Sequence, residues 1–196
     1  MIAYIDGKLT HKDPTYVIID VQGIGYQIKI SLNTYARLTE GERCKLHTFL
    51  HIKEDAHTLY GFSDLAEKNI FLHLISISGV GPGTGLMIVS SLSVPEIQQA
   101  IVREDVRTIQ QVKGIGGKTA QRIILELKDK FKKESWEEAG ALPQTVHNTN
   151  RNEALSALIT LGFARNVAEK TLDAIIKRDG HHLSVEALIK LALKSS

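Results

Sequence analysis

The stretch VKGIGGKTAQRII, residues 112–124, decides how this sequence is interpreted. A glycine-rich turn is followed by Lys118 and Thr119 and then by apolar residues at helical spacing, an arrangement suited to holding a phosphate group. A nucleotide-binding P-loop would need a glycine at position 112, which is valine, and a strand before the turn, where the pattern is helical. The sequence therefore disfavours an intrinsic ATP site, and we expect no cofactor.

A second copy of the same pattern lies earlier in the chain. A shift of 35 residues places ISGVGPGTGLMIVSSL (77–92) over VKGIGGKTAQRIILEL (112–127). The aligned residues include Gly79 with Gly114, Gly81 with Gly116, and Thr84 with Thr119. Glycines here permit unusual backbone conformations and a close approach of phosphate, and the helix that follows offers unpaired N–H groups. Two such turns side by side predict contact with two backbone phosphates of a nucleic acid, without reading of its bases.

Positive charge gathers around the second turn. Residues 112–133 contain seven Lys/Arg and two Asp/Glu, a net charge of +5, whereas the whole chain carries +2. Residues 1–62 are neutral overall and residues 134–196 carry −1. A single G-x-G turn can simply connect two helices, but two aligned copies beside this concentration of cations favour a phosphate-binding role.

The N-terminal third has the pattern of short strands. Residues 1–62 contain five β-branched or aromatic segments separated by turn signals, namely IAYIDGKLT, TYVIIDVQG, GYQIKISL, CKLHTFLHI and HTLYGF. Five short strands without a long helix predict an OB-type β-barrel. From residue 63 to 133 apolar residues recur at helical spacing, and Ser93 with Glu96 forms a capping box that predicts the start of a helix. The predicted fold class is multi-domain α and β.

The remaining residues are predicted to form a linker and a small helical domain. Residues 134–150 are polar and interrupted by glycine and proline, which favours a flexible linker. Residues 151–196 resume helical patterning in three segments, broken at Gly162 and Gly180. The sequence contains a single cysteine, Cys44, and has neither a signal-peptide pattern nor an apolar run long enough for a membrane span. We therefore expect a cytoplasmic protein.

The whole chain resembles the RuvA family of bacterial Holliday-junction-binding proteins. The likeness runs from MIAYIDGKL through the turns GVGP and GIGGKTAQRI to EALSALITLGF, and the paired turns look like tandem helix-hairpin-helix motifs. Motif order, spacing and total length all agree with that family. The resemblance implies an OB-fold barrel (1–62), a tandem helix-hairpin-helix DNA-binding domain (63–133), a linker (134–150) and a three-helix domain (151–196).

The resemblance also implies a function and partners. Proteins of this family bind four-way junction DNA without sequence preference and, as homotetramers, hold it open and planar during recombination and repair. The C-terminal domain would bind the RuvB ATPase, which drives branch migration, while the RuvC resolvase cuts the junction. The chain itself would have no catalytic site. Whether one tetramer or two, forming an octamer, hold the junction is left open.

Site residues carry over from the family at the matching positions. The DNA-binding set is Gly79, Gly81, Thr84, Gly114, Gly116, Gly117, Lys118, Thr119 and Arg122. The family usually has lysine where this chain has Gly83 and a basic residue where it has Gly117, so each hairpin would lack one cation. Thr84 and backbone amides would then carry more of the first site. Because salt dependence follows the phosphates neutralised, at about 0.9 per contact, we expect a shallower salt slope than that of a typical relative.

Two further sets of residues match the family with an alternative left open. Glu54 and Asp55 lie in the turn of HIKEDAHTLYGF, and by themselves they favour an ordinary solvated turn. The resemblance instead implies that they form the family's acidic pin, whose negative charge would steer strands and disfavour ordinary duplex at the junction centre. The predicted surface for RuvB is a partly covered apolar patch made by Leu158, Leu161, Phe163 and Leu188. These four residues equally fit the core of the small domain.

Three other classes of function find less support. Three histidines lie in or near one predicted strand, but no cysteine pair or acidic cluster accompanies His47, His51 and His57, so no metal site is expected. A base-excision glycosylase would need a catalytic aspartate after the hairpin, and Asp129 instead lies among lysines on a polar helix face. Single-strand binding would use the barrel's tyrosines as stacking platforms, but the barrel segment carries no net positive charge; the candidates are Tyr4, Tyr16, Tyr26 and Tyr60.

Overall fold

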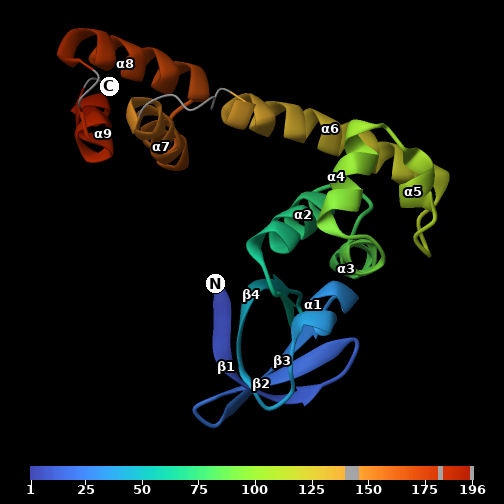
Figure 1. Ribbon diagram of the computed structural model, residues 1–196. Helices are drawn as coiled ribbons and strands as arrows, with labels where there is room; N and C mark the ends of the chain where they lie inside the picture. Colours follow the sequence, from blue (N-terminus) through green and yellow to red (C-terminus); the bar gives the residue numbers. More distant parts are fainter. Residues whose placement is uncertain (140–145, 181–182, 195–196) are drawn as a thin grey trace. The chain divides into compact units, whose positions relative to one another are not determined.

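The computed structural model describes residues 1–139, 146–180 and 183–194, with the backbone alone at 131–139 and 146–149. The chain forms two compact units, Met1–Glu134 and Ser135–Ser196. The first unit contains a β-barrel followed by helices, and the second is helical (Figure 1). The predicted class, a multi-domain chain of separate β and α segments, is confirmed.

The barrel is formed by five strands that close on one another in the order β1-β2-β3-β5-β4. Their bounds are β1 (Tyr4–Lys12), β2 (Tyr16–Val21), β3 (Ile24–Ile30), β4 (Arg43–Ile52) and β5 (His57–Phe62). All neighbouring pairs are antiparallel except β3 and β5, which run parallel. Alternate side chains, such as Val17 and Ile19 on β2, are fully buried inside the barrel because successive residues of a strand point to opposite faces. Each predicted strand is therefore present.

A short helix, α1 (Leu32–Arg37), lies between β3 and β4 and was not predicted. Its first turn is capped by Ser31, whose side chain accepts a hydrogen bond from the Thr34 amide at 3.0 Å. With six residues it is too short to display a helical period in the sequence. Helix propensity alone does not stabilise so short a helix, and α1 is held in place by contacts with other parts of the first unit.

The helices of the first unit share one core with the end of the barrel. They are α2 (Leu65–Ile75), α3 (Pro82–Ser91), α4 (Val94–Val102), α5 (Val106–Gln110) and α6 (Gly117–Ala139). The predicted capping box is present at α4, where the Ser93 amide donates to the Glu96 carboxylate at 2.7 Å. Tyr60 and Phe62 of β5 pack on Phe71 of α2, with ring centroids 5.4 and 4.8 Å apart. The barrel and the helical segment thus meet through a shared aromatic cluster.

The second unit is built from α7 (Val146–Thr160), α8 (Arg165–Asp179) and α9 (Val185–Lys194), which enclose their own apolar core. The predicted breaks occur at Gly162 and Gly180, which have positive φ angles of 99° and 89°. Helix also covers residues 134–139 and 146–150, so it extends further into the segment 134–150 than the sequence analysis predicted. Most of residues 134–139 are glutamate or alanine, which are good helix formers, so α6 continues through this part of the segment. The flexibility of this segment stays a prediction.

Candidate nucleic-acid interface

The two glycine turns have the same backbone structure. We call α2, its turn and α3 the first hairpin (65–91), and α5, its turn and α6 the second hairpin (106–139). In the first hairpin, the Ile77 amide donates to the Leu74 carbonyl at 3.1 Å and the Val80 amide to the Ile77 carbonyl at 3.0 Å. In the second, the Val112 amide donates to the Ile109 carbonyl at 3.2 Å and the Ile115 amide to the Val112 carbonyl at 3.1 Å. The bonds entering each following helix, Gly85 to Gly81 and Ala120 to Gly116, are both 2.9 Å. Every donor and acceptor is displaced by 35 residues, so the sequence repeat is also a structural repeat.

The glycines of each turn serve two different needs. Gly79 and Gly114 have φ angles of 89° and 88°, a left-handed conformation that side-chain-bearing residues rarely adopt. Gly81 has a φ of −82°, and a Cβ added at Gly81 or Gly116 would meet nothing within 4 Å. Neither backbone strain nor packing within the chain therefore requires glycine at these two positions. A bare backbone facing open space is what the close approach of a phosphate oxygen needs.

The apolar residue between the two glycines anchors each turn. Val80 and Ile115 are 4% and 6% exposed and belong to the shared core. They fix the turn while the glycines on either side stay exposed. The first turns of α3 and α6 follow directly, and their unpaired amides present partial positive charge at the surface. Thr84 and Thr119 lie half-buried at equivalent positions in these turns.

The basic side chains of the second hairpin, which include the predicted site residues Lys118 and Arg122, differ in their contacts. Lys113 and Lys118 are exposed, and neither has an ion-pair partner in the part of the chain that the structure describes. Arg122, one turn further along α6, donates from Nη1 to the carbonyl oxygen of Ser78 at 3.0 Å. Lys130 of α6 donates to the Ser76 hydroxyl. Arg122 and Lys130 therefore connect the second hairpin to the turn of the first.

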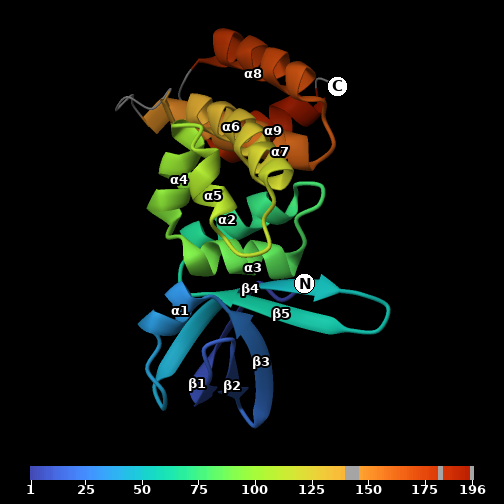
Figure 2. The same cartoon turned by 90° about the vertical axis from the view of Figure 1, so that its right-hand side faces the viewer.

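The acidic pair predicted as a pin lies at the tip of the β4–β5 hairpin. The strands remain paired up to Ile52 and His57, and the Lys53 amide closes the turn by donating to the Ala56 carbonyl at 2.9 Å. Glu54 and Asp55 lie between these residues and are exposed. Figure 2 shows this hairpin projecting beyond the other strands. Both carboxylates are consequently presented to solvent at the end of a two-stranded support.

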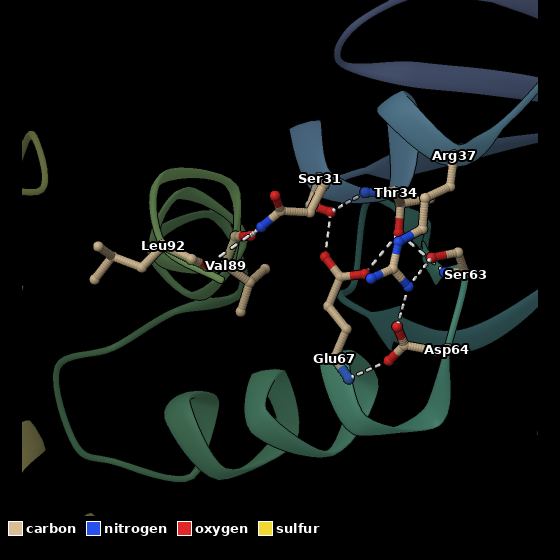
Figure 3. Close-up of polar contacts among 9 residues, drawn as sticks. Ser31, Thr34, Arg37, Ser63, Asp64, Glu67, Val89 and Leu92 are labelled. Atoms are coloured by element: carbon tan, nitrogen blue, oxygen red, sulfur yellow. Dashed lines mark hydrogen bonds and ion pairs between the residues drawn. The ribbon is translucent and has the colours of Figure 1, made fainter. Parts of the chain in front are cut away.

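A polar cluster that the sequence analysis missed joins the barrel to the first hairpin (Figure 3). Glu67 of α2 is only 3% exposed, and its carboxylate accepts hydrogen bonds from the Ser31 hydroxyl and, at 2.7 Å, from the Thr34 hydroxyl. Thr34 Oγ1 in turn accepts from the Ser63 amide at 2.9 Å. Burial raises the pKa of Glu67 above its ordinary value, while the two hydroxyls act to lower it. A buried carboxylate thus ties α1 to α2.

Further contacts extend this junction toward α3. Arg37 of α1 pairs with Asp64, which caps α2 by accepting from the Glu67 amide at 2.7 Å. Burial acts to raise the pKa of Asp64, but the hydrogen bond from that amide and the Arg37 charge outweigh it and lower the pKa. Asn33 Nδ2 donates to the Val89 carbonyl of α3 at 2.6 Å. The barrel is therefore fixed to both helices of the first hairpin.

In the sequence, Asp64 and Glu67 look like an ordinary helix start, because an acceptor followed three residues later by glutamate is the capping-box spacing. Nothing in that spacing distinguishes a glutamate that caps its own helix from one that bonds to another element. The partners Ser31 and Thr34 are more than 30 residues away, and the fold alone brings them together.

Comparison with known proteins places this architecture in a family. Residues 1–61 match the RuvA N terminal domain, residues 71–129 the SAM-like helix-hairpin-helix tandem, and residues 149–196 the RuvA C-terminal domain. A protein of Cytophaga hutchinsonii named Holliday junction branch migration complex subunit RuvA is 61% identical over 199 residues, which cover all of both chains. The chain belongs to the RuvA family. Proteins with the same name from Christiangramia forsetii and Geotalea daltonii are 50% and 42% identical, with at least 98% of each chain covered.

The residues predicted as a partner surface on this RuvA-family chain do not share one environment. Leu158 and Leu188 are 0% and 2% exposed and lie in the core of the second unit. Phe163 packs partly against that core, whereas Leu161 is 59% exposed. The expectation that all four are only partly covered is therefore wrong for Leu158 and Leu188, because α7 and α9 turn these side chains toward the shared interior. Leu161 and Phe163 stay candidates for a partner surface.

The alternative functions would depend on a cluster of metal-ligating side chains or on exposed tyrosines of the barrel. Within residues 1–139, 146–180 and 183–194, no group of three His, Cys, Asp or Glu side chains is placed to hold a metal ion. Tyr60 is buried and Tyr4 is 55% exposed, so the barrel tyrosines do not present a common stacking surface. No single described helix is both long and apolar enough to cross a membrane; α3 and α4 pass that test only together, as a pair bent by 97°.

Proposed function

We propose that this chain is a junction-binding subunit of a branch migration complex, which recognises four-way DNA junctions without reading their sequence. The observation that carries the proposal is the structural repeat of the two hairpins, in a family whose relatives are named Holliday junction branch migration complex subunits. Each hairpin offers exposed glycine backbone and a helix N-terminus, the combination that binds phosphate. Contacts of this kind position DNA and carry no base information.

The DNA contacts are divided between backbone and side chains. At the first hairpin, Gly79, Gly81 and Thr84 surround one phosphate position. At the second, Gly114, Gly116, Gly117 and Thr119 surround another. Lys118 and Arg122, both on α6, add positive charge to the interface. The spacing of the two positions is held by the shared core beneath Val80 and Ile115. Two fixed phosphate sites suit one strand of a duplex arm, and several subunits would be needed to hold the arms of a junction.

The acidic turn supplies selectivity rather than affinity. Glu54 and Asp55 repel phosphates, so an intact duplex crossing their position would be disfavoured. At the centre of an open four-way junction the strands separate, and a pair of carboxylates can occupy the space between them. Its projection from the barrel supports this role, because the β4–β5 hairpin carries both charges clear of the other strands.

The complex requires further partners. We infer that the chain forms homotetramers, as one such assembly or as an octamer of two, and that its second unit binds the RuvB ATPase through the exposed Leu161 and the neighbouring Phe163. RuvC would act on the junction that the assembly holds. Chemical energy would come from the ATPase, so this subunit is proposed to be non-catalytic and to need no cofactor.

A competition gel shift at about 100 mM salt tests the proposal. A synthetic four-way junction competes with linear duplex and with single strand of equal length, for the parent and for the double variant Glu54→Gln/Asp55→Gln. We expect strong junction preference in the parent and tighter duplex binding by the variant. Equal affinity of the parent for junction and duplex would leave only a general helix-hairpin-helix DNA binder, and preference for single strands would favour binding through the barrel.

A further inference from the structure

The two hairpins have the same backbone but very different charge. The second hairpin carries three basic side chains around its turn, Lys113, Lys118 and Arg122. At the equivalent positions, 35 residues earlier, the first hairpin has Ser78, Gly83 and Met87. No lysine or arginine occurs anywhere between residues 76 and 92. The first turn therefore has the geometry of a phosphate site without a cation of its own.

Arg122 brings a cation to that turn from the second hairpin. Its side chain is exposed at the surface, and its Nη1 donates to the carbonyl oxygen of Ser78 at 3.0 Å. Ser78 directly precedes the left-handed Gly79, so the guanidinium lies at the start of the first turn. Lys130 contacts the hydroxyl of Ser76, two residues earlier, and holds the same segment.

The Arg122 guanidinium can bind the Ser78 carbonyl and a phosphate at the same time. It has five N–H donors in a planar arrangement, and the Ser78 carbonyl uses one of them. The other N–H groups of the fixed guanidinium can donate to two oxygens of one phosphate. Because the carbonyl holds the side chain in place, less conformational entropy is lost when DNA binds.

We propose that Arg122 supplies the positive charge of the first hairpin's phosphate site, although it belongs by sequence to the second hairpin. The inference rests on the proposed DNA-binding function and deepens it. Lys118 then serves the second site alone, and the two sites are linked by one side chain. Lys130 acts as a positioning residue that holds the Ser76 end of the first turn.

The test adds a lysine to each hairpin in turn, in the parent and in Arg122→Gln. Gly83→Lys places a lysine at the position equivalent to Lys118, and Gly117→Lys places one in the second hairpin. A Cβ at Gly83 would meet nothing within 4 Å, and one at Gly117 would meet only the Gln110 side chain at an ordinary 3.7 Å. Neither glycine has a positive φ. Gly83→Gln is the control for the gain in helix propensity without charge.

The readout is the slope of log affinity against log salt for a linear duplex, which remains informative even if junction selectivity is absent. Arg122→Gln is expected to weaken binding about 10-fold and to lower the slope by about 0.9. Gly83→Lys should restore the slope in Arg122→Gln but add little in the parent, whose first phosphate is already neutralised. Gly117→Lys should have the same effect in both backgrounds, because it addresses a different site.

Four results would overturn the inference. An unchanged slope in Arg122→Gln would mean that the residue only holds the Ser78 carbonyl. Equal effects of Gly83→Lys in the two backgrounds would mean that Arg122 does not neutralise the first phosphate. Rescue by Gly117→Lys alone would assign Arg122 to the second hairpin. A parent that binds no DNA would overturn both the inference about Arg122 and the proposed function. A parent that binds duplex without preferring junctions would overturn the proposed function alone.

Discussion

Removal of the Glu67 carboxylate should loosen the connection between the barrel and the first hairpin. The carboxylate is 3% exposed and accepts hydrogen bonds from the hydroxyls of Ser31 and Thr34. A hydrogen bond to a charged group is worth about 1.5–3 kcal/mol, and part of that gain is offset by the cost of burying the charge. We therefore expect Glu67→Ala to lower the free energy of unfolding of the first unit by about 3 kcal/mol at pH 7.

The same site should give a defined dependence on pH. Because burial raises the folded-state pKa of Glu67 above its unfolded value of about 4.3, protonation of the carboxyl makes a contribution to stability in addition to that of the hydrogen bonds, and this contribution is fully present below that value. The contribution is lost as pH rises through the raised folded-state pKa. Glu67→Gln keeps the shape of the side chain without the charge, so it should remove this dependence and lie within about 1 kcal/mol of the parent at pH 7.

Hydrogen exchange followed by mass spectrometry is the assay of choice, because it reports separately on each compact unit of the full chain. Protection of the amides in α1 and in the first turn of α2 should fall in Glu67→Ala, while protection in α8 should not change. The matched control is Glu96→Ala, which removes a glutamate from the same helix position of α4, where it is exposed and its carboxylate bonds to Ser93. Equal losses in Glu67→Ala and Glu96→Ala, or equal losses in Glu67→Ala and Glu67→Gln, would refute the reasoning.

Three other outcomes are expected. Gly79→Ala should lower the free energy of unfolding by about 1–2 kcal/mol because the φ of Gly79 is 89°. Gly81→Ala should leave the melting temperature unchanged. It should still weaken junction binding in a gel shift, because the added Cβ would occupy the phosphate position. Lys118→Gln should lower the salt slope of duplex binding by about 0.9 without altering the circular dichroism spectrum; an unchanged slope would remove Lys118 from the interface. Leu158→Ala should destabilise the second unit by about 3 kcal/mol. Leu161→Ser should reduce RuvB binding in a pull-down while the second unit stays folded. Retained binding would exclude Leu161 from the RuvB surface.

Local patterns predicted the elements of this protein well. Alternating β-branched residues identified the strands, and the repeated G-[VI]-G turns identified both hairpins, because a strand period, a left-handed glycine and a helix start are each set by residues within a few positions of one another. The capping box at Ser93 and the breaks at Gly162 and Gly180 belong to the same class. The charge concentration near Lys118 was also visible without a structure.

The errors share a different origin. α1 was missed because six residues show no period, and it depends on Glu67, more than 30 residues away. For Leu158 and Leu188 the sequence left a partly covered patch and a core position equally open, because an apolar residue on a short helix looks the same whether it faces a neighbouring helix or solvent. Only the packing of α7 against α9 distinguishes the two cases.

The amino-acid sequence by itself determined the order of the elements, the repeat of the glycine turns and the place of the acidic pair, since each depends on short-range backbone preference and on charge. Tertiary structure alone decided that Glu67 joins the barrel to the hairpins and that Arg122 reaches across to Ser78. The physical reason is that such contacts depend on distance and burial. Both quantities are properties of the folded chain, and residue spacing in a single sequence does not encode them locally.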